Sequence, residues 1–110
     1  MRKAAPIPSR DELHAAVRIL FEGTDAETVI EILERYEAWR WKESRERVQM
    51  AVLVLSKGTL DGVRKYVAEA NGDYRNVLLW SEYTKPGLAL RDEVEHRLAA
   101  AGQTPWAAVM

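Results

Sequence analysis

Apolar residues recur at steps of three and four through most of the chain, which is the spacing that lines one face of an α-helix. The first such stripe follows Ser9 and Glu12, a capping-box pair in which each side chain accepts a hydrogen bond from the other residue's backbone N–H. The pattern predicts a helix that begins there and is ended by Gly23 in a left-handed conformation. Its inward positions are Leu13, Ala16, Val17, Leu20 and Phe21.

A second helix is predicted directly after the first, because Thr24 and Glu27 repeat the capping-box spacing. The segment 36–44 then lacks a clear apolar stripe and contains neither Gly nor Pro. Two alternatives stay open: Ser44 caps a separate third helix, or one long helix runs through this segment. The inward positions of the second helix are Val29, Ile30, Leu33 and Tyr36.

The stretch 48–55 is strongly apolar and contains Val52 and Val54, so it could be mistaken for a strand. Polar residues on both sides of it favour a helix whose apolar side chains point in more than one direction. Such a helix is typical of the centre of a bundle, packed on all sides. We therefore expect a central helix near 45–57, ended by Gly58.

Turn chemistry divides the next part of the chain. Thr59 is placed to cap a fourth helix, and the run 71–73 combines a stop with a start. Gly72 can adopt a positive φ that ends the fourth helix, and Asp73 can cap a fifth. The inward positions of these two helices are Leu60, Val63, Tyr66, Val67 and Ala70, then Tyr74, Val77, Leu78 and Trp80.

Pro86 and Gly87 are expected to break the chain before a last helix over about 88–101. Gly102 then closes this helix. The inward positions of the last helix are Leu90, Val94, Leu98 and Ala101.

The predicted fold class is therefore all-α: a compact bundle of five or six short helices, antiparallel or orthogonal, around the central helix near 45–57. Short connections favour contact between helices that are neighbours in sequence. We expect one domain over residues 1–110, with 1–8 as an N-terminal arm and 103–110 as a C-terminal tail.

Composition narrows the function classes. The 110 residues include no Cys, which excludes disulfides, thiolate metal sites and cysteine nucleophiles. Sixteen Lys and Arg against seventeen Asp and Glu give no long-range attraction for nucleic acid or anionic lipid. We find no secretory signal pattern, and the longest apolar run, Met50 to Leu55, is far shorter than a membrane span. A soluble, cytoplasmic protein is expected.

Three stretches between Arg47 and Tyr83 carry a resemblance: R-V-Q-M-A-V-L-V-L-S-K-G, L-D-G-V-R-K-Y-V and D-Y-R-N-V-L-L-W-S-E-Y. They resemble the core of a family of small, uncharacterised, all-helical bacterial proteins. The resemblance covers about a third of the chain, and it rests mainly on apolar residues. It implies a helical fold and a bacterial source, and it transfers no activity or site residue.

Catalytic chemistry finds little support in the residue pattern. His14 and His96 stand far apart, and pairing on an exposed helix face explains Asp92 beside His96. The carboxylates gather near helix starts, where the helix dipole favours them. The sequence contains no nucleophile elbow, phosphate-binding loop or dinucleotide turn. We predict no enzyme, with no catalytic, cofactor-binding or metal-binding residue.

Aromatic and basic residues are densest between Trp39 and Arg47. A tryptophan at a helix junction can close the core, and Trp and Arg are also the residues most enriched at protein–protein contacts. Stacking on unpaired bases, with cations on phosphates, is the third interpretation. Together with the apolar tail, the candidate interface consists of Trp39, Arg40, Trp41, Lys42, Arg45, Pro105, Trp106, Val109 and Met110.

The predicted function is non-enzymatic: a protein-interaction or scaffolding module whose partner is another protein or a second copy of itself, as a homodimer. The alternative is a nucleic-acid-binding protein, through the Trp39–Arg47 strip or through a helix-turn-helix-like corner within 60–83. The sequence leaves open whether the tail docks on its own bundle or on a neighbour.

Trp39→Ala or Trp41→Ala is expected to abolish association while the far-ultraviolet circular dichroism stays helical, because an interface anchor contributes little to the core. Light scattering and circular dichroism of each variant check this. Unfolding of either variant would instead assign that tryptophan to the core.

Overall fold

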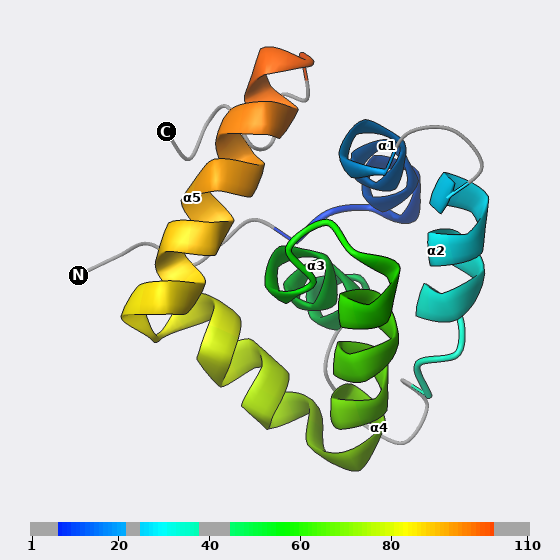
Figure 1. Cartoon of the computed structure of the whole chain (residues 1–110), viewed down its shortest axis with the longest axis vertical. Coiled ribbons are helices and arrows are strands. Elements are labelled where there is room, and N and C mark those ends of the chain that lie inside the picture. The colour runs from blue at the N-terminus through cyan, green and yellow to red at the C-terminus, as the bar shows by residue number, and fades with distance from the viewer. Residues whose placement is uncertain (1–6, 22–24, 38–44, 103–110) are drawn as a thin grey trace.

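The computed structural model describes residues 7–21, 25–37 and 45–102, and all of the regular structure in these ranges is helical. Five helices follow one another within these ranges, and they pack around α3 (Figure 1). The all-α prediction is confirmed for the described ranges. None of the helices there is both long and apolar enough to cross a bilayer. The helices are α1 Arg10–Leu20, α2 Asp25–Leu33, α3 Arg45–Leu55, α4 Leu60–Glu82 and α5 Lys85–Ala100.

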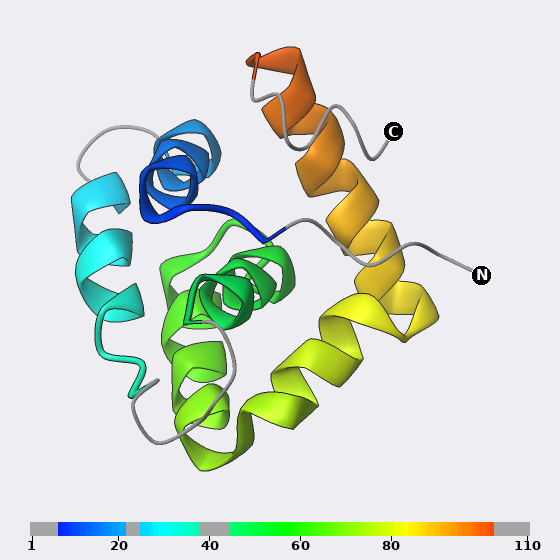
Figure 2. The same ribbon diagram turned by 180° about the vertical axis from the view of Figure 1, so that it is seen from behind.

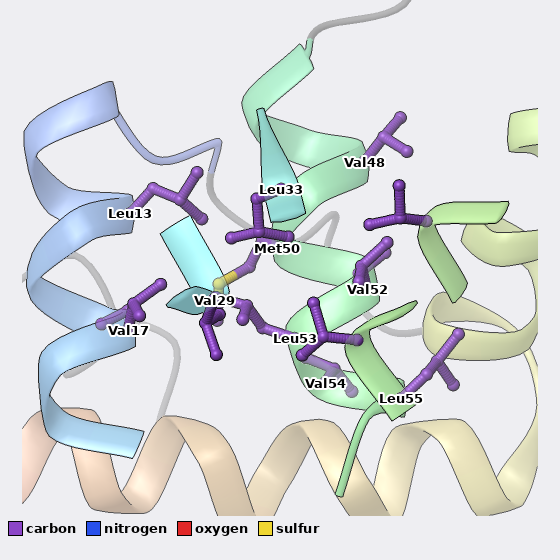
Figure 3. Packing of buried hydrophobic residues seen from close by; sticks show 14 of the residues in the cluster. Leu13, Val17, Val29, Leu33, Val48, Met50, Val52, Leu53, Val54 and Leu55 are labelled. Carbon is purple, nitrogen blue, oxygen red and sulfur yellow. The ribbon is translucent and has the colours of Figure 1, made fainter. Parts of the chain in front are cut away.

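Helix α3 is the centre of the bundle, as predicted. Every residue from Val48 to Leu55 is buried, so the helix has no solvent-facing side over this length. It contacts α1, α4 and α5, and the two opposite views place it between α2 and α5 (Figures 1 and 2). In the core, Leu13 and Val17 of α1 point toward Met50 of α3 (Figure 3).

Helix α1 begins with the predicted capping box. The Ser9 N–H donates to Glu12 Oε1 at 2.9 Å, and the Glu12 N–H donates to Ser9 Oγ at 3.1 Å. The helix stops at Leu20, because Phe21 adopts an extended backbone and buries its ring in the core. It therefore ends before Gly23, which lies outside the described residues together with Thr24, the predicted cap of the second helix.

Helices α2 and α3 are separate. This confirms the alternative of a separate third helix and excludes one long helix through the segment 36–44. Helix α2 ends at Leu33, and Tyr36 and Glu37 are not helical. The end of α2 is held by a buried side chain of α3, since Gln49 Nε2 donates to the Leu33 carbonyl at 2.8 Å. Asn71 of α4 also binds here, and its Oδ1 accepts from the Glu37 N–H at 2.8 Å. The predicted cap Ser44 lies outside the described residues.

Helix α4 is interrupted where the sequence predicts the end of one helix and the start of the next, but Asp73 rather than Gly72 makes the interruption. Gly72 does not adopt a positive φ; instead Asp73 leaves the helical region, with φ −157° and ψ 104°. Its Oδ1 accepts from the Arg75 N–H at 3.0 Å, which caps the second half as expected. The two halves form a sharp angle (Figure 1), and Tyr66 and Trp80 meet edge to face across it, with ring centroids 6.2 Å apart.

The expected break at Pro86 and Gly87 is wrong, because both residues lie inside the first turn of α5. A proline fits there since its missing N–H would have no helical partner. Thr84 is the cap: its Oγ1 accepts from the Gly87 N–H at 3.1 Å and donates to the Trp80 carbonyl at 2.6 Å. A Cβ at Gly87 would overlap that same carbonyl, so glycine lets α4 and α5 meet closely at this corner.

The corner between α3 and α4 contains two consecutive left-handed residues, Lys57 with φ 56° and Gly58 with φ 75°. Thr59 then caps α4 as predicted, and its hydroxyl accepts from the Gly62 N–H at 3.0 Å. Gly102, with φ 86°, follows the end of α5 in the same conformation, as predicted. The left-handed region is disfavoured for any residue with a Cβ, so Lys57 is strained.

Lys57→Gly is expected to raise the free energy of unfolding by about 1 kcal/mol, because glycine removes the cost of the left-handed conformation. Urea denaturation measures this change. Lys65→Gly is the matched control: Lys65 lies in the helical interior of α4, where glycine should lower stability by about 1 kcal/mol. An equal decrease in the free energy of unfolding for both variants would show that Lys57 is not strained.

Candidate protein-interaction surface

Eight of the nine residues predicted as interface lie outside the described residues. Trp39, Arg40, Trp41 and Lys42 lie outside the described residues, as do Pro105, Trp106, Val109 and Met110. The remaining member, Arg45, is in the first turn of α3. Its Nη1 lies 3.4 Å from Glu34 Oε2, and its Nη2 donates to the Tyr36 carbonyl at 3.5 Å. Arg45 thus ties the start of α3 to the residues that follow α2.

The Glu34 carboxylate lies close to three basic side chains. In addition to Arg45, its carboxylate lies 3.1 Å from Arg10 Nη2 and 3.7 Å from His14 Nε2. His96 lies on α5, where its Nδ1 is 2.8 Å from the Asp92 carbonyl of the preceding turn. Within the described ranges, no cluster of three or more His, Asp or Glu side chains is arranged to hold a metal ion.

A partly buried ion pair connects α3 to the second half of α4. Arg47 donates to Glu82 twice, from Nη2 to Oε1 at 2.7 Å and from Nε to Oε2 at 3.1 Å. The Glu82 side chain is 8% exposed and that of Arg47 is 27% exposed. A two-pronged contact of this kind fixes orientation as well as distance, so it sets how α4 lies against α3.

Arg91 of α5 extends the same network. Its side chain is 2% exposed, and its Nη2 lies 3.9 Å from Glu82 Oε2. It also donates to the Ser81 carbonyl and to Ser81 Oγ, both at 3.4 Å. Glu95, one turn further along α5, is equally buried. Three helices therefore meet through charged groups that are largely buried. The desolvation of such groups is offset only when each has an oppositely charged or hydrogen-bonding partner.

The inward face of α5 agrees with the prediction at Leu98 and differs from it elsewhere. Its buried positions are Gly87, Arg91, Glu95 and Leu98. Leu90 and Val94 are only partly buried, and Ala101 is exposed. The spacing of Arg91, Glu95 and Leu98 is itself helical, so the signal was present in the sequence. The assumption that inward positions are apolar concealed it, because charged residues are rarely buried.

The outer side of the second half of α4 and the residue that caps its end present an exposed row. Its members are Arg75, Leu79 and the cap residue Tyr83, each four residues from the next. Leu79 is 50% exposed and Tyr83 is 70% exposed. Beside this row is an open hollow of about 420 Å³, which Leu78 and Tyr74 line together with Arg47. We call the row and the hollow together the α4 outer face; its members are Arg47, Tyr74, Arg75, Asn76, Leu78, Leu79 and Tyr83.

The charge of Arg75 on this face is already balanced within the chain. Its Nε and Nη2 each donate to one carboxylate oxygen of Asp73 at 2.9 Å. The side-chain hydrogen bond from Arg75, followed by that from its backbone N–H, lowers the pKa of Asp73 below its ordinary value. The same contact raises the pKa of Arg75. The face is therefore polar at its edge without carrying a net charge there.

A second hollow, of about 240 Å³, lies between the ends of α1 and α3 and the middle of α5. Its floor is apolar, with Leu53 and Val54 among the lining residues. Arg97 stands at its edge, and its Nη2 donates to the Ile19 carbonyl at 3.1 Å. This volume is below the range of roughly 300–1,000 Å³ that is usual for small-molecule sites.

Comparison with known protein families, characterised proteins and solved structures finds no match for this chain. The described residues therefore show a small, compact, all-helical protein. The resemblance over residues 47–83 does not assign the chain to a family.

Arg91→Met is expected to lower the free energy of unfolding by about 3–5 kcal/mol, because it removes one partner from a buried charged network. Chemical denaturation followed by circular dichroism measures the loss. Arg64→Met is the control, since Arg64 and Asp61 form an exposed pair whose loss should cost less than about 0.5 kcal/mol. Similar small losses in both variants would show that the network does not hold α5.

Proposed function

We propose that this protein acts by binding another protein through the α4 outer face. The observation that carries the proposal is the row on α4, in which Leu79 and Tyr83 expose half or more of their side-chain surface beside a hollow lined by Leu78. Apolar and aromatic groups gathered next to a concavity are typical of protein contacts. Tyrosine is enriched among the residues that contribute most to binding.

The support beneath this face favours the proposal, because a rigid surface loses little entropy when it binds. Val77 and Leu78 are buried directly below the row. The Arg47–Glu82 pair, whose arginine lines the hollow, and the buried contact of Arg91 with Ser81 hold the same segment in place. Leu79 on α4 and Tyr83 just after its end are therefore displayed by a segment whose position is set by buried contacts.

The charges of the described residues favour a protein partner over a nucleic acid. Arg45, Arg47 and Arg75 each lie against a carboxylate of the same chain. A phosphate would have to compete with these contacts, and the chain as a whole carries a net charge of −1. Apolar burial at Leu79 and Tyr83 needs no such exchange.

A photoreactive p-benzoylphenylalanine in place of Tyr83 is expected to form a discrete protein adduct in the host cell, because the ring would lie inside the contact. The same group at Glu69, an exposed position in the first half of α4, should give none. Leu79→Glu, combined with the probe at position 83, should remove the adduct by placing a charge in an apolar contact. Gel mobility and mass spectrometry identify the products.

Leu79→Glu is not expected to unfold the protein, since half of the Leu79 side chain is already exposed and such surface changes alter stability by about 0.5 kcal/mol or less. Circular dichroism of this variant is the control. Equal adducts from positions 83 and 69, or no protein adduct from either, would overturn the proposal; nucleic acid cross-linked at position 83 would point to the alternative function.

A further inference from the structure

We infer that the partner of the α4 outer face is a second copy of this chain, joined across a two-fold axis that passes beside Leu79. This inference rests on the proposed function and names its partner. It is argued from the order of residues along the exposed row and from the balance of charge on the face.

The row is self-complementary when two copies are antiparallel. Arg75 and Tyr83 each stand four residues from Leu79, on opposite sides of it. A two-fold axis at Leu79 therefore places Arg75 of each copy opposite Tyr83 of the other, and the two Leu79 side chains against each other. The row is about 12 Å long, and rows of this i, i+4 type pack side by side in the commonest class of helix packing.

The opposed groups suit each other chemically. The edge of the Arg75 guanidinium is engaged by Asp73 through Nε and Nη2, which leaves its flat faces available for stacking. A guanidinium face stacks favourably on an aromatic ring, and this stacking does not disturb hydrogen bonds made in the guanidinium plane. Tyr83, 70% exposed, offers such a ring. Two equivalent Arg–Tyr contacts then flank a central leucine pair.

The balance of charge permits a copy to meet itself. A patch with a net charge would repel an identical patch, since symmetry brings like charges together. Here Arg75 is neutralised by Asp73, and Arg47 is neutralised by Glu82, within each copy. The symmetric contact therefore brings together apolar surface and paired ions, and it leaves no charge facing its own image.

A cysteine trap tests the position of the axis, because the chain has no natural Cys. Leu79→Cys should form an intermolecular disulfide under mild oxidation at least about tenfold faster than Glu69→Cys, since the axis holds the two thiols within bonding distance. Glu69 is exposed and distant from the row along α4, so it reports random collision.

A charge-pair experiment tests the same axis without a covalent bond. Leu79→Glu and Leu79→Lys should each be monomeric by light scattering, because like charges would face each other across the axis. An equimolar mixture of the two should associate again, as opposite charges then meet. Circular dichroism confirms that both variants are folded.

The inference is overturned if Leu79→Cys reacts no faster than Glu69→Cys, or if the mixed variants stay monomeric. The mass of the adduct formed by the photoreactive group at position 83 separates the two proposals. An adduct of twice the chain mass supports the second copy. An adduct with a different protein refutes the second copy and leaves the proposed function standing, whereas the absence of any protein adduct refutes both.

Discussion

The bundle depends on one constraint: α3 has no side that faces water. A helix with buried residues all around its circumference must be surrounded by other elements, and α1, α4 and α5 each contact it. The burial includes Gln49, whose amide donates to the Leu33 carbonyl at the end of α2, where the Tyr36 N–H also donates. The central helix thus supplies both the apolar core and a polar contact that fixes where a neighbour ends.

The buried charges add orientation to this packing. Apolar contacts tolerate sliding and rotation, whereas the Arg47–Glu82 pair has one geometry in which both of its hydrogen bonds form. Arg91 joins the same carboxylate from α5, so a shift of any one of the three helices would leave a buried charge without its partner. The outward display of Leu79 and Tyr83 follows from this alignment, because Glu82 lies on the same turn of α4.

Local chemistry in the sequence predicted much of the fold. The capping box at Ser9, the cap at Thr59, the stop at Gly102 and the central helix are confirmed, since each depends on neighbouring residues. The start of α5 was missed although its signals are also local, since Thr84 caps the helix and Pro86 fits its first turn. The buried charges of α5 depend instead on tertiary contacts.

The candidate surface was missed for a related reason. Leu78 and Leu79 are adjacent and equally apolar, and packing against the other helices decides which one turns outward. The inward orientation of Arg91 was missed likewise, because apolar periodicity places every charged residue on the surface. Of the interface predicted from sequence, Arg45 alone lies among the described residues, where it joins the ends of two helices.

The hydrogen bond from Arg97 to the Ile19 carbonyl joins the last helix to the first, across 78 positions of sequence. Helix α5 also contributes to the shared network through Arg91. A chain leaves the ribosome with its N-terminus first. Helices α1 to α4 therefore lack the contacts of Arg91 and Arg97 until α5 has been released. The bundle is therefore completed only after α5 has been released, and shorter nascent chains expose the side of α3 that α5 covers.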